Sequence, residues 1–569
     1  MNKIKEIKRL LDDKLNGYEV IVITILFLVS VLGTISLVRE KISQKYLVEK
    51  PIYGGILNEG IVGNITNANP FFPNTQTDKD VAKLLYAPFS DFVYKTEISE
   101  DYTTYDFYIN DAATFHDSSA ISYQDIALSF DLFKKSKGSN LSDSLKDIKI
   151  SNNEKNKITF KLTSKGEKDL SEKLNFPIIK SSEYKNIEDI ESFIKNSKVS
   201  MGLVGSGAFY IKSINKKDND NVEKITLLRF NSKIPKQSYI KSIVLNFYTS
   251  EDQALKDFTD GKINLITGIH SKAVEEVSKG KNTKLNKTEL TTNFAIFINQ
   301  KNNESLKSRD FREYLNGSIN RKKIISDIFN DFAKEIDTLN GEVQNYNNAE
   351  LLEKLQKAGF IFENGVLYRS TEQIKKSDAE KKQIEISLTT INNPELKKTA
   401  EAIKEDWSKI GIKVNISLIE KSEIASSLKD KNFDMFLFGL NISDKKSYYS
   451  FFHSSQTSYP KLNIAGYANK KVDSLTEKLL EDGVDLETQI ASVKELSSEI
   501  QKERPVLLLY KPFFSTIYRT DKLNLIFANQ IKDNEDRYLN IVDWFIYKEK
   551  TFPILKNNSF IKKMEMYIY

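Results

Sequence analysis

A strand–helix–strand pattern between residues 384 and 418 limits this chain to folds that contain a parallel β-sheet. Ile384, Ile386 and Leu388 alternate with polar neighbours, which is typical of a strand with one buried face. A helix is expected from Asn393-Pro394 onwards, because apolar residues then recur at steps of three and four, at Leu396, Ala400, Ile403, Trp407 and Ile410. Gly411 ends this helix, and a period of two resumes at Ile412, Val414, Ile416 and Leu418. Two strands joined by a helix of this length form a βαβ unit.

The same order of elements recurs elsewhere in the chain. The segments SIVLNFY, SEDQALKDFTDG and INLITGI (242–269) predict a strand, a helix and a strand, and 433–440 predicts a fully buried strand. Residues 215–224 are expected to form a polar hairpin or loop, and 370–383 a solvated connector. Since 569 residues are enough for several domains, we predict an α/β fold with more than one lobe.

One stretch near the start, Val20–Val38 (VIVITILFLVSVLGTISLV), carries no charge. As a helix it would span roughly 28 Å, close to the thickness of the hydrocarbon core of a bilayer. A cleaved signal peptide is the alternative, although its apolar core is usually shorter and ends at an A-x-A-like site. We therefore expect a cytoplasmic segment at 1–19, a transmembrane anchor at 20–38 and a linker at 39–50. Basic residues flank the run on both sides, so charge does not decide on which side of the membrane the remainder lies.

Charge and cysteine content exclude several classes of function. The chain holds 84 basic and 78 acidic residues, which are spread along its length and give a net charge of +6. A nucleic-acid-binding protein would concentrate its excess positive charge in a patch or tail, so we expect no nucleic-acid partner. The absence of cysteine rules out disulfides, thiolate zinc sites and a thiol nucleophile.

The stretch TFHDSSAISYQDIALSF (114–130) places His116 beside Asp117, which is raw material for acid–base or metal chemistry. A catalytic role needs a nucleophile, an oxyanion donor or a metal partner nearby, and this stretch supplies none. Ser122 and Asp125 have the spacing of a capping box at the start of a helix. We therefore interpret His116 and Asp117 as part of a structural turn that precedes a helix.

Other catalytic patterns are incomplete. The segment GLVGSGAFY (202–210) lacks the Lys-Ser/Thr pair of a phosphate-binding loop and the third glycine of a dinucleotide fingerprint. No H-E-x-x-H motif occurs, and the aromatic segment SYYSFFH (447–453) is interpreted as core packing rather than as a pocket wall. The sequence thus predicts a protein that is not an enzyme and has no metal site and no cofactor.

Seven segments follow one another in the order of a known family. They are GGILNEGIVGNITNANPFFPNTQTDKDVAKLLYAPF, YDFYINDAATFHDSSAISYQDIALSFDLF, GSGAFYIKSI, TNFAIFINQKNNESLKSRDFREYLNGSINRKKII, LLEKLQKAGF, AIKEDWSKIGIKV and AGYANKKVDSLTEKLL. Over roughly residues 54–520 the chain resembles the extracellular solute-binding proteins of family 5, the oligopeptide/dipeptide class of ABC importer receptors. It departs from that family at Ser118, where a glycine is usual, at Ala208, where proline is common, and in lacking a lipid-modified cysteine.

The resemblance implies a two-lobed, three-domain periplasmic-binding-protein-like fold that closes about a hinge. Its first lobe would comprise 51–89, 200–285 and 511–569, its extra small domain 90–199 and its second lobe 286–510. Because such domains lie outside the membrane, the resemblance also implies a single-pass protein with a cytoplasmic N-terminus and an extracellular or periplasmic body.

The resemblance also implies a ligand site. Peptide-binding relatives pair the ligand's ammonium group with an aspartate after the buried strand, and the matching residue is Asp444, whose alternative role is that of an ordinary loop carboxylate. Further residues expected at the site are the strand end Gly439, Leu440 and Asn441, the facing loop residues Asn74 and Gln76, and the crossover residue Tyr510. Leu440 stands where tryptophan is common in relatives.

The function implied is that of a membrane-anchored receptor, expected to be monomeric, which captures peptides and delivers them to the permease subunits of an ABC transporter. Three alternatives stay open at this point. The same fold can capture another solute, such as an oligosaccharide or a metal chelate, and a receptor of this kind can signal without a permease. An anchored hydrolase is disfavoured because no nucleophile constellation is present.

Overall fold

The computed structural model describes residues 16–46, 48–137, 145, 147–163, 170–217, 221–231, 233–234, 236–370, 383–481 and 483–551. The chain forms two compact units, one made of Met1–Gly55 with Phe545–Tyr569 and the other of Ile56–Trp544. Most of the segment predicted to be cytoplasmic, 1–19, and most of the predicted connector, 370–383, lie outside the described residues.

The first unit contains a helix and a short ribbon. Helix α2 (Gly17–Tyr46) includes the uncharged run, and strand β1 (Val48–Ile52) pairs antiparallel with β21 (Tyr547–Thr551). Many apolar side chains of α2 are exposed, among them Leu26 and Phe27. No helix within the described residues is both long enough and apolar enough to cross a bilayer.

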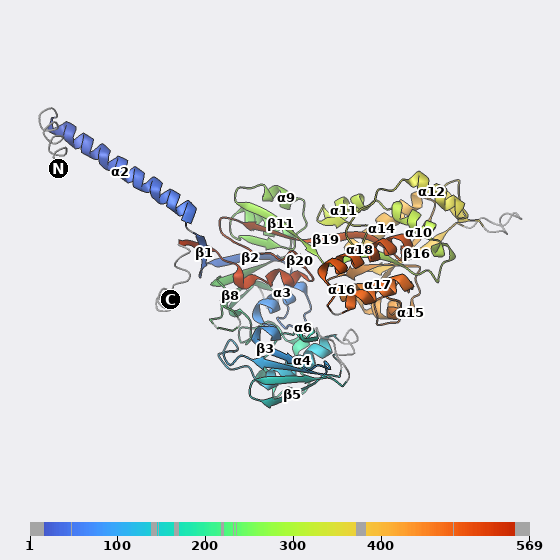
Figure 1. The fold of residues 1–569 in the computed structure, drawn as a ribbon, viewed down its shortest axis with the longest axis horizontal. Helices are drawn as coiled ribbons and strands as arrows, with labels where there is room; N and C mark the ends of the chain where they lie inside the picture. The colour runs from blue at the N-terminus through green and yellow to red at the C-terminus, as the bar shows by residue number, and fades with distance from the viewer. Residues whose placement is uncertain are drawn as a thin grey trace. The chain divides into compact units, whose positions relative to one another are not determined.

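A large sheet organises the second unit (Figure 1). Its strands lie in the order β17 (Lys413–Ile419), β16 (Glu385–Ile391), β18 (Met435–Asn441), β12 (Thr292–Ile298), β19 (Val506–Arg519), β10 (Leu265–Thr267), β2 (Ile56–Val62), β9 (Ser242–Tyr248), β8 (Val222–Arg229) and β7 (Phe209–Lys216). Three further strands branch from this row, namely β11 (Thr283–Leu290), β13 (Ala333–Glu335) and β20 (Gln530–Ile531).

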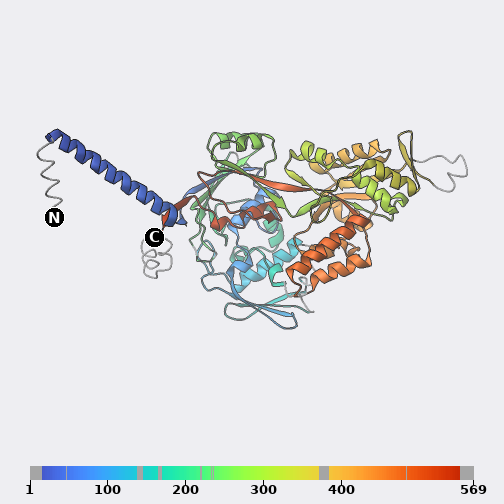
Figure 2. The ribbon, with the colours of Figure 1, turned by 45° about the horizontal axis from the view of Figure 1, so that its top comes forward.

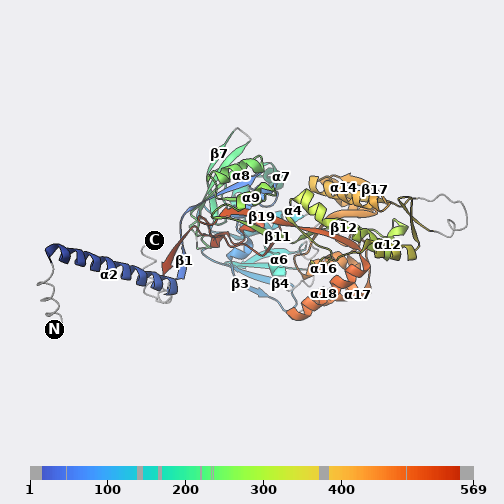
Figure 3. The ribbon, with the colours of Figure 1, turned by 90° about the horizontal axis from the view of Figure 1, so that it is seen from above.

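Strand β19 belongs to both halves of this sheet. Its residues 506–510 pair with β12, whereas residues 513–519 pair with β11. The chain crosses a second time at Thr291, between the end of β11 and the start of β12. The two halves are therefore joined by two neighbouring chain crossings, which Figure 3 shows near the middle of the second unit.

The predicted βαβ unit is confirmed. Strands β16 and β17 are parallel and are joined by helix α14 (Pro394–Lys409), whose first turn is capped by the Asn393 side chain. Trp407 is fully buried and its indole Nε1–H donates to the carbonyl of Leu315 at 3.0 Å. Leu418, predicted on the buried face of β17, is 38% exposed because β17 is the edge strand of the sheet.

The second predicted unit is also confirmed, as β9, helix α8 (Glu251–Thr259) and β10. The polar segment 215–224 connects the antiparallel strands β7 and β8, whose ends pair at Lys216 and Val222, and its residues 218–220 lie outside the described residues. Both results support the predicted order of elements, because the connection between two strands lies where the hydrophobic period of the sequence changes.

Alternate residues of the central strands face two different cores. Along β12, Ile296 and Ile298 pack with helices α10 (Arg309–Gly317), α11 (Arg321–Phe329), α12 (Asn348–Lys357) and α14. The intervening Ala295 and Phe297 pack instead with α16 (Lys445–Phe452), α17 (Lys470–Leu480) and α18 (Leu486–Glu503). Helices thus cover both faces of this half of the sheet, which explains why its strands are almost continuously apolar (Figure 3).

A separate four-stranded antiparallel sheet has the order β3 (Val93–Ile98), β4 (Thr104–Ile109), β6 (Lys157–Lys161) and β5 (Lys149–Glu154). It lies in the blue and cyan region of Figure 2, with helix α4 (Tyr123–Lys137). Its core is built largely from phenylalanines, of which Phe89 and Phe176 stack at 5.3 Å between ring centroids. The predicted capping box is present at the start of α4, since Ser122 N–H donates to Asp125 and Asp125 N–H donates to Ser122.

The histidine turn binds to a glycine loop from another part of the chain. The Gly205 N–H donates to Nδ1 of His116 at 3.1 Å, so the proton lies on Nε2, which donates to the carbonyl of Gly207 at 3.0 Å. Burial lowers the pKa of His116 to about 4, against a smaller opposing effect of the Gly207 carbonyl. Both ring nitrogens are therefore occupied by structural hydrogen bonds.

Candidate functional site

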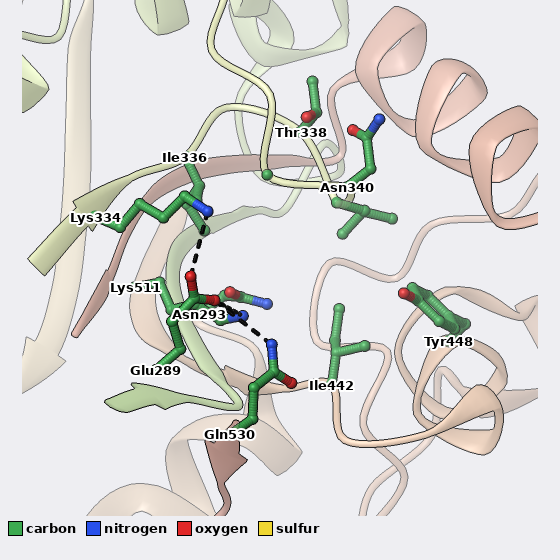
Figure 4. Close-up of a pocket in the computed structure, with 12 residues that line it drawn as sticks. Glu289, Asn293, Lys334, Ile336, Thr338, Asn340, Ile442, Tyr448, Lys511 and Gln530 are labelled. Carbon is green, nitrogen blue, oxygen red and sulfur yellow. Dashed lines mark hydrogen bonds and ion pairs between the residues drawn. The ribbon is translucent and has the colours of Figure 1, made fainter. Parts of the chain in front are cut away.

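A pocket of about 240 Å³ lies where the strands cross between the two halves of the sheet. We call it the crossover pocket (Figure 4), and its lining residues are Glu289, Asn293, Lys334, Ile336, Thr338, Leu339, Asn340, Gly341, Ile442, Tyr448, Lys511 and Gln530. They come from β11, β12, β13, β19, β20, the segments after β13 and β18, and helix α16, which carries Tyr448. The large sheet therefore brings together residues that are distant in sequence.

A three-charge cluster forms one wall of the crossover pocket. The Glu289 carboxylate lies 3.3 Å from the Lys334 ammonium and 3.1 Å from that of Lys511. Gln530 Nε2–H donates to the same carboxylate at 3.5 Å (Figure 4). Burial alone would raise the pKa of Glu289, but Lys511 and Lys334 outweigh it and hold the pKa below its usual range.

A second hollow of about 560 Å³ adjoins the first, and we call it the α18 groove. The two share Asn340, Ile442, Tyr448 and Gln530, so they are neighbouring parts of one depression. The α18 groove adds a set of polar and charged residues, Glu342, Ser443, Asp444, Lys445, Gln489 and Lys494. Its apolar wall consists of Leu479, Leu486, Ile490 and Val493.

Asp444 lines the α18 groove as the N-cap of helix α16. Its Oδ1 accepts hydrogen bonds from the backbone N–H and from the hydroxyl of Ser447, both at 2.9 Å. The residue is exposed. Its position is thus compatible with both roles considered from the sequence, that of an ordinary carboxylate and that of a partner for the ligand's ammonium group, since a capping carboxylate can also face a ligand.

The strand end at 439–441 approaches the site without lining either hollow. Leu440 is fully buried in the core beneath α16–α18. Asn441 accepts a hydrogen bond from the Thr291 hydroxyl at 3.0 Å, which ties the end of β18 to the chain crossing. Gly439 pairs with Phe294 on β12, and a Cβ there would lie 3.0 Å from the Thr292 methyl group. Ile442, the next residue along the chain, lines both hollows.

Tyr510 lies in the core and its neighbour Lys511 lies in the crossover pocket. The Tyr510 ring stacks on Phe294 at 5.2 Å, and its hydroxyl lies 3.3 Å from that of Thr399 on α14. Burial raises the pKa of Tyr510. Because successive strand residues point to opposite sides, the crossover segment presents Lys511 rather than Tyr510 to the pocket.

Asn74 and Gln76 lie in the first half of the second unit, and neither lines the two hollows. The Asn74 amide donates to the Thr66 hydroxyl at 3.2 Å. Gln76 is the first residue of helix α3 (Gln76–Leu85), and its amide donates to Asp80 at 3.0 Å and to Glu535 at 2.8 Å. The structure therefore brings Asp444, together with Ile442 and Lys511, the neighbours of Asn441 and Tyr510, to one site. Asn74 and Gln76 do not line that site.

Sequence reasoning missed Glu289, Lys334, Lys511 and Gln530. Each is a charged or polar residue within a strand, a pattern that alone indicates only a solvated face. It also interpreted 447–453 as core, which holds for Phe451 and Phe452, whereas Tyr448 packs against the same core and also lines both hollows. Within the described residues, no group of three or more His, Cys, Asp or Glu is arranged to hold a metal ion.

Comparison with known proteins agrees with this architecture. The family model of the bacterial extracellular solute-binding proteins, family 5, matches residues 88–459, which is more than half of the chain. The oligopeptide-binding protein AppA of Bacillus subtilis is 23% identical over 512 residues, covering 83% of this chain and 88% of AppA.

Two solved structures illustrate the shared fold. AppA in complex with a nonapeptide has a TM-score of 0.60 at 21% identity, with 88% of this chain and 100% of that chain covered. NikA of Brucella suis in complex with Fe(III)-EDTA has a TM-score of 0.66 at 17% identity, with coverages of 87% and 100%. At these identities the likeness establishes a periplasmic-binding-protein-like α/β fold.

The relatives are solute-binding proteins, which is consistent with the prediction that this chain is not an enzyme. The extended match to the family model, together with a two-part sheet joined by paired chain crossings, identifies the family. The chain belongs to the bacterial extracellular solute-binding proteins of family 5, the receptors of ABC importers.

Proposed function

We propose that this protein captures peptides in the depression formed by the crossover pocket and the α18 groove, and delivers them to an ABC permease. The observation that carries the proposal is the position of Asp444, an exposed carboxylate on the wall of a groove beside the chain crossings. Similarity to an oligopeptide-binding protein over most of both chains supports the same ligand class.

The lining of the depression suits a peptide main chain. Buried peptide N–H and C=O groups need partners, and the side chains of Asn293, Asn340 and Gln530 offer both donors and acceptors. The apolar wall of the α18 groove offers room for a side chain without polar groups. Water molecules in such a groove can bridge between the protein and ligand side chains of different kinds, so peptides of varied sequence can bind.

Asp444 would pair with the ammonium group of the peptide, because an unpaired charge would be costly to bury. The test replaces Asp444 with alanine and measures the binding of one peptide with a free and with an acetylated amino terminus. We expect the free form to lose about tenfold or more in affinity and the acetylated form to change little. The peptide is chosen from those recovered on the purified protein from a peptide mixture by mass spectrometry.

Asp485 provides a matched control. It is also an exposed N-cap, of helix α18, where it accepts from the backbone N–H of Thr488 at 2.9 Å and from its hydroxyl at 2.7 Å. Each substitution removes a helix cap and should cost about 1 kcal/mol of stability. Only Asp444→Ala should discriminate between the two peptide forms, and equal losses for both forms would remove Asp444 from this role.

A chelated metal ion is the second candidate ligand. It is supported by the fold similarity to NikA, whose structure holds Fe(III)-EDTA. Titration calorimetry with Fe(III)-EDTA and with the recovered peptides separates the two candidates. Saturable binding of the chelate with no retained peptide would favour the second.

The membrane anchor and the domain division also belong to this proposal. The uncharged run Val20–Val38 supports an anchor. Membership of the extracellular solute-binding proteins supports a body outside the cell and a cytoplasmic N-terminus. The proposed division has a first lobe (51–89, 200–285, 511–569), a small domain (90–199) and a second lobe (286–510), and within Ile56–Trp544 it is supported by separate hydrophobic cores. Deletion of residues 1–38 behind a cleavable export signal should release the body into the medium, and retention in washed membranes would argue against the anchor.

A further inference from the structure

The crossover pocket carries an excess of positive charge. Of its lining residues, Lys334 and Lys511 are basic and Glu289 alone is acidic, so one ammonium group is not neutralised within the pocket. The remaining polar lining residues, Asn293, Thr338, Asn340 and Gln530, are uncharged. An anion that entered this pocket would meet two cations and a single competing carboxylate.

Partial enclosure strengthens this charge. The Lys511 side chain is 16% exposed and that of Glu289 is 28% exposed, whereas that of Lys334 is 46% exposed, so the enclosure applies to the first two. Charges at such depth are less screened by solvent than those on an open surface. The pKa of Glu289 is lowered despite its burial because the same two lysines stabilise its charged form.

Strand pairing places the two cations around one point. Lys334 on β13 and Lys511 on β19 are directly paired strand positions, and β11, which carries Glu289, pairs with β19 just beyond them. The Glu289 carboxylate occupies the point between the two ammonium groups (Figure 4). A ligand carboxylate has the same shape and charge and can take the same place if Glu289 turns away.

We propose that the crossover pocket is a carboxylate subsite of the ligand groove, in which Lys334 and Lys511 select ligands that carry an anionic group and Glu289 occupies the subsite when no ligand is bound. The proposal rests on the proposed peptide-binding function and names the preferred peptides. These carry an acidic side chain, or place their terminal carboxylate in the pocket. Both sources present the same chemical group to the lysines.

The experiment uses the full chain and a defined peptide mixture. The mixture contains equal amounts of nine-residue peptides in three versions: with a glutamate and a free carboxyl terminus, with glutamine in place of that glutamate, and with the carboxyl terminus amidated. Retained peptides are counted by mass spectrometry. We expect the wild-type protein to enrich the carboxylate-bearing version about tenfold over the version that lacks the relevant carboxylate. If the glutamine version is the one that is not enriched, the carboxylate comes from the acidic side chain. If it is the amidated version, the carboxylate comes from the peptide terminus.

Four variants test the residues. Lys334→Met and Lys511→Met should each abolish most of this enrichment, whereas Glu289→Gln should increase it. Lys287→Met is the matched control, because Lys287 lies on β11, the strand that carries Glu289, and forms an ion pair with Glu275 at 3.0 Å but does not line the pocket. Thermal unfolding of each variant shows whether it is folded.

The outcomes separate the two proposals. Retention of peptides with the same carboxylate enrichment in Lys334→Met and Lys511→Met as in the wild type would overturn the subsite and leave peptide binding intact. Equal retention of all three versions by the wild-type protein would overturn it as well, and would show that the cluster is only a structural ion network. If the wild-type protein retained no peptide, the proposed function itself would fail.

Discussion

At the residue scale, His116 makes the stability of the protein depend on pH. Its folded pKa of about 4 lies below the ordinary value of 6.5, because burial penalises the charged form. The unfolded chain therefore binds more protons between these two values. The stabilising contribution is complete above pH 6.5 and is lost as the pH falls towards 4.

We expect the free energy of unfolding to decrease between pH 7 and pH 5, by on the order of 1–2 kcal/mol from this residue. Urea unfolding at both values measures the change. His116→Gln should lower stability at pH 7, since it disturbs the bonds to Gly205 and Gly207, but should show a smaller decrease between the two pH values. An identical decrease in the variant would show that other groups cause it.

Ser118 illustrates a local cost that the fold imposes on one residue. Its φ of 66° is in the left-handed region, which is unfavourable for residues other than glycine. Ser118→Gly should therefore stabilise the protein by up to about 1 kcal/mol, measured by urea unfolding. Ala120→Gly in the same turn, where φ is not positive, should instead be neutral or destabilising, and a loss of stability in Ser118→Gly would contradict the strain argument.

At the scale of elements, the glycine loop at 205–207 is fitted against the end of helix α3. A Cβ on Gly207 would lie 2.6 Å from the carbonyl carbon of Leu85 and 2.7 Å from the carbonyl oxygen of Leu84, and both atoms belong to the backbone. The Gly207 N–H also donates to the Leu85 carbonyl at 2.7 Å. This close approach explains why the loop needs a residue without a side chain at this point.

Gly207→Ala should destabilise the protein by about 2 kcal/mol or more, because helix and loop must separate. Gly202→Ala is the control, since a Cβ there meets nothing within 4 Å. Thermal unfolding of both variants gives the comparison. Equal melting temperatures would mean that the loop adjusts without cost.

At the scale of the whole molecule, a buried ionic network joins the two ends of the second unit. Arg537 contacts both carboxylate oxygens of Asp80, at 2.7 and 2.9 Å, and lies 3.3 Å from Glu59. The Tyr538 hydroxyl donates to Glu59 at 2.7 Å. Desolvation is the largest influence on Glu59 and raises its pKa, against the opposing charge of Arg537. The network thus fixes strand β2 and helix α3 to a segment more than 450 residues later in the chain.

Arg537→Met should cost about 3–5 kcal/mol, because it leaves two buried carboxylates without their cation. The exposed ion pair between Lys471 and Glu495, 3.0 Å apart, supplies the comparison, and Lys471→Met should cost less than about 1 kcal/mol. Chemical unfolding at neutral pH measures both. If the two variants proved equally stable, the network would contribute little to holding these segments together.

The sequence predicted well whatever depends on neighbours along the chain. The βαβ unit at 384–418, the cap of α14 by Asn393 and the capping box of α4 were all expected, and all are present. Hydrophobic period and capping act over a few residues, so they can be interpreted without knowledge of the fold. Leu418 shows the limit of this reasoning, since its exposure follows from the position of β17 at the edge of the sheet.

The candidate site was predictable only in part for the same reason. Asp444 and the chain crossing near Tyr510 were expected from the resemblance, but the pocket contains the next residue, Lys511. Alternation along β19 decides which of these two neighbours faces the core, and that alternation has no fixed phase until the strand is paired.

By itself, the sequence determined the α/β architecture of this protein, its local caps and turns, and its resemblance to a family. Only the tertiary structure decided which charges meet, because Glu289 and Lys511 are 222 residues apart and are brought within 3.1 Å by the pairing of β11 with β19. The register between distant strands is set by the packing of the whole sheet, and the charge of the crossover pocket follows from that register.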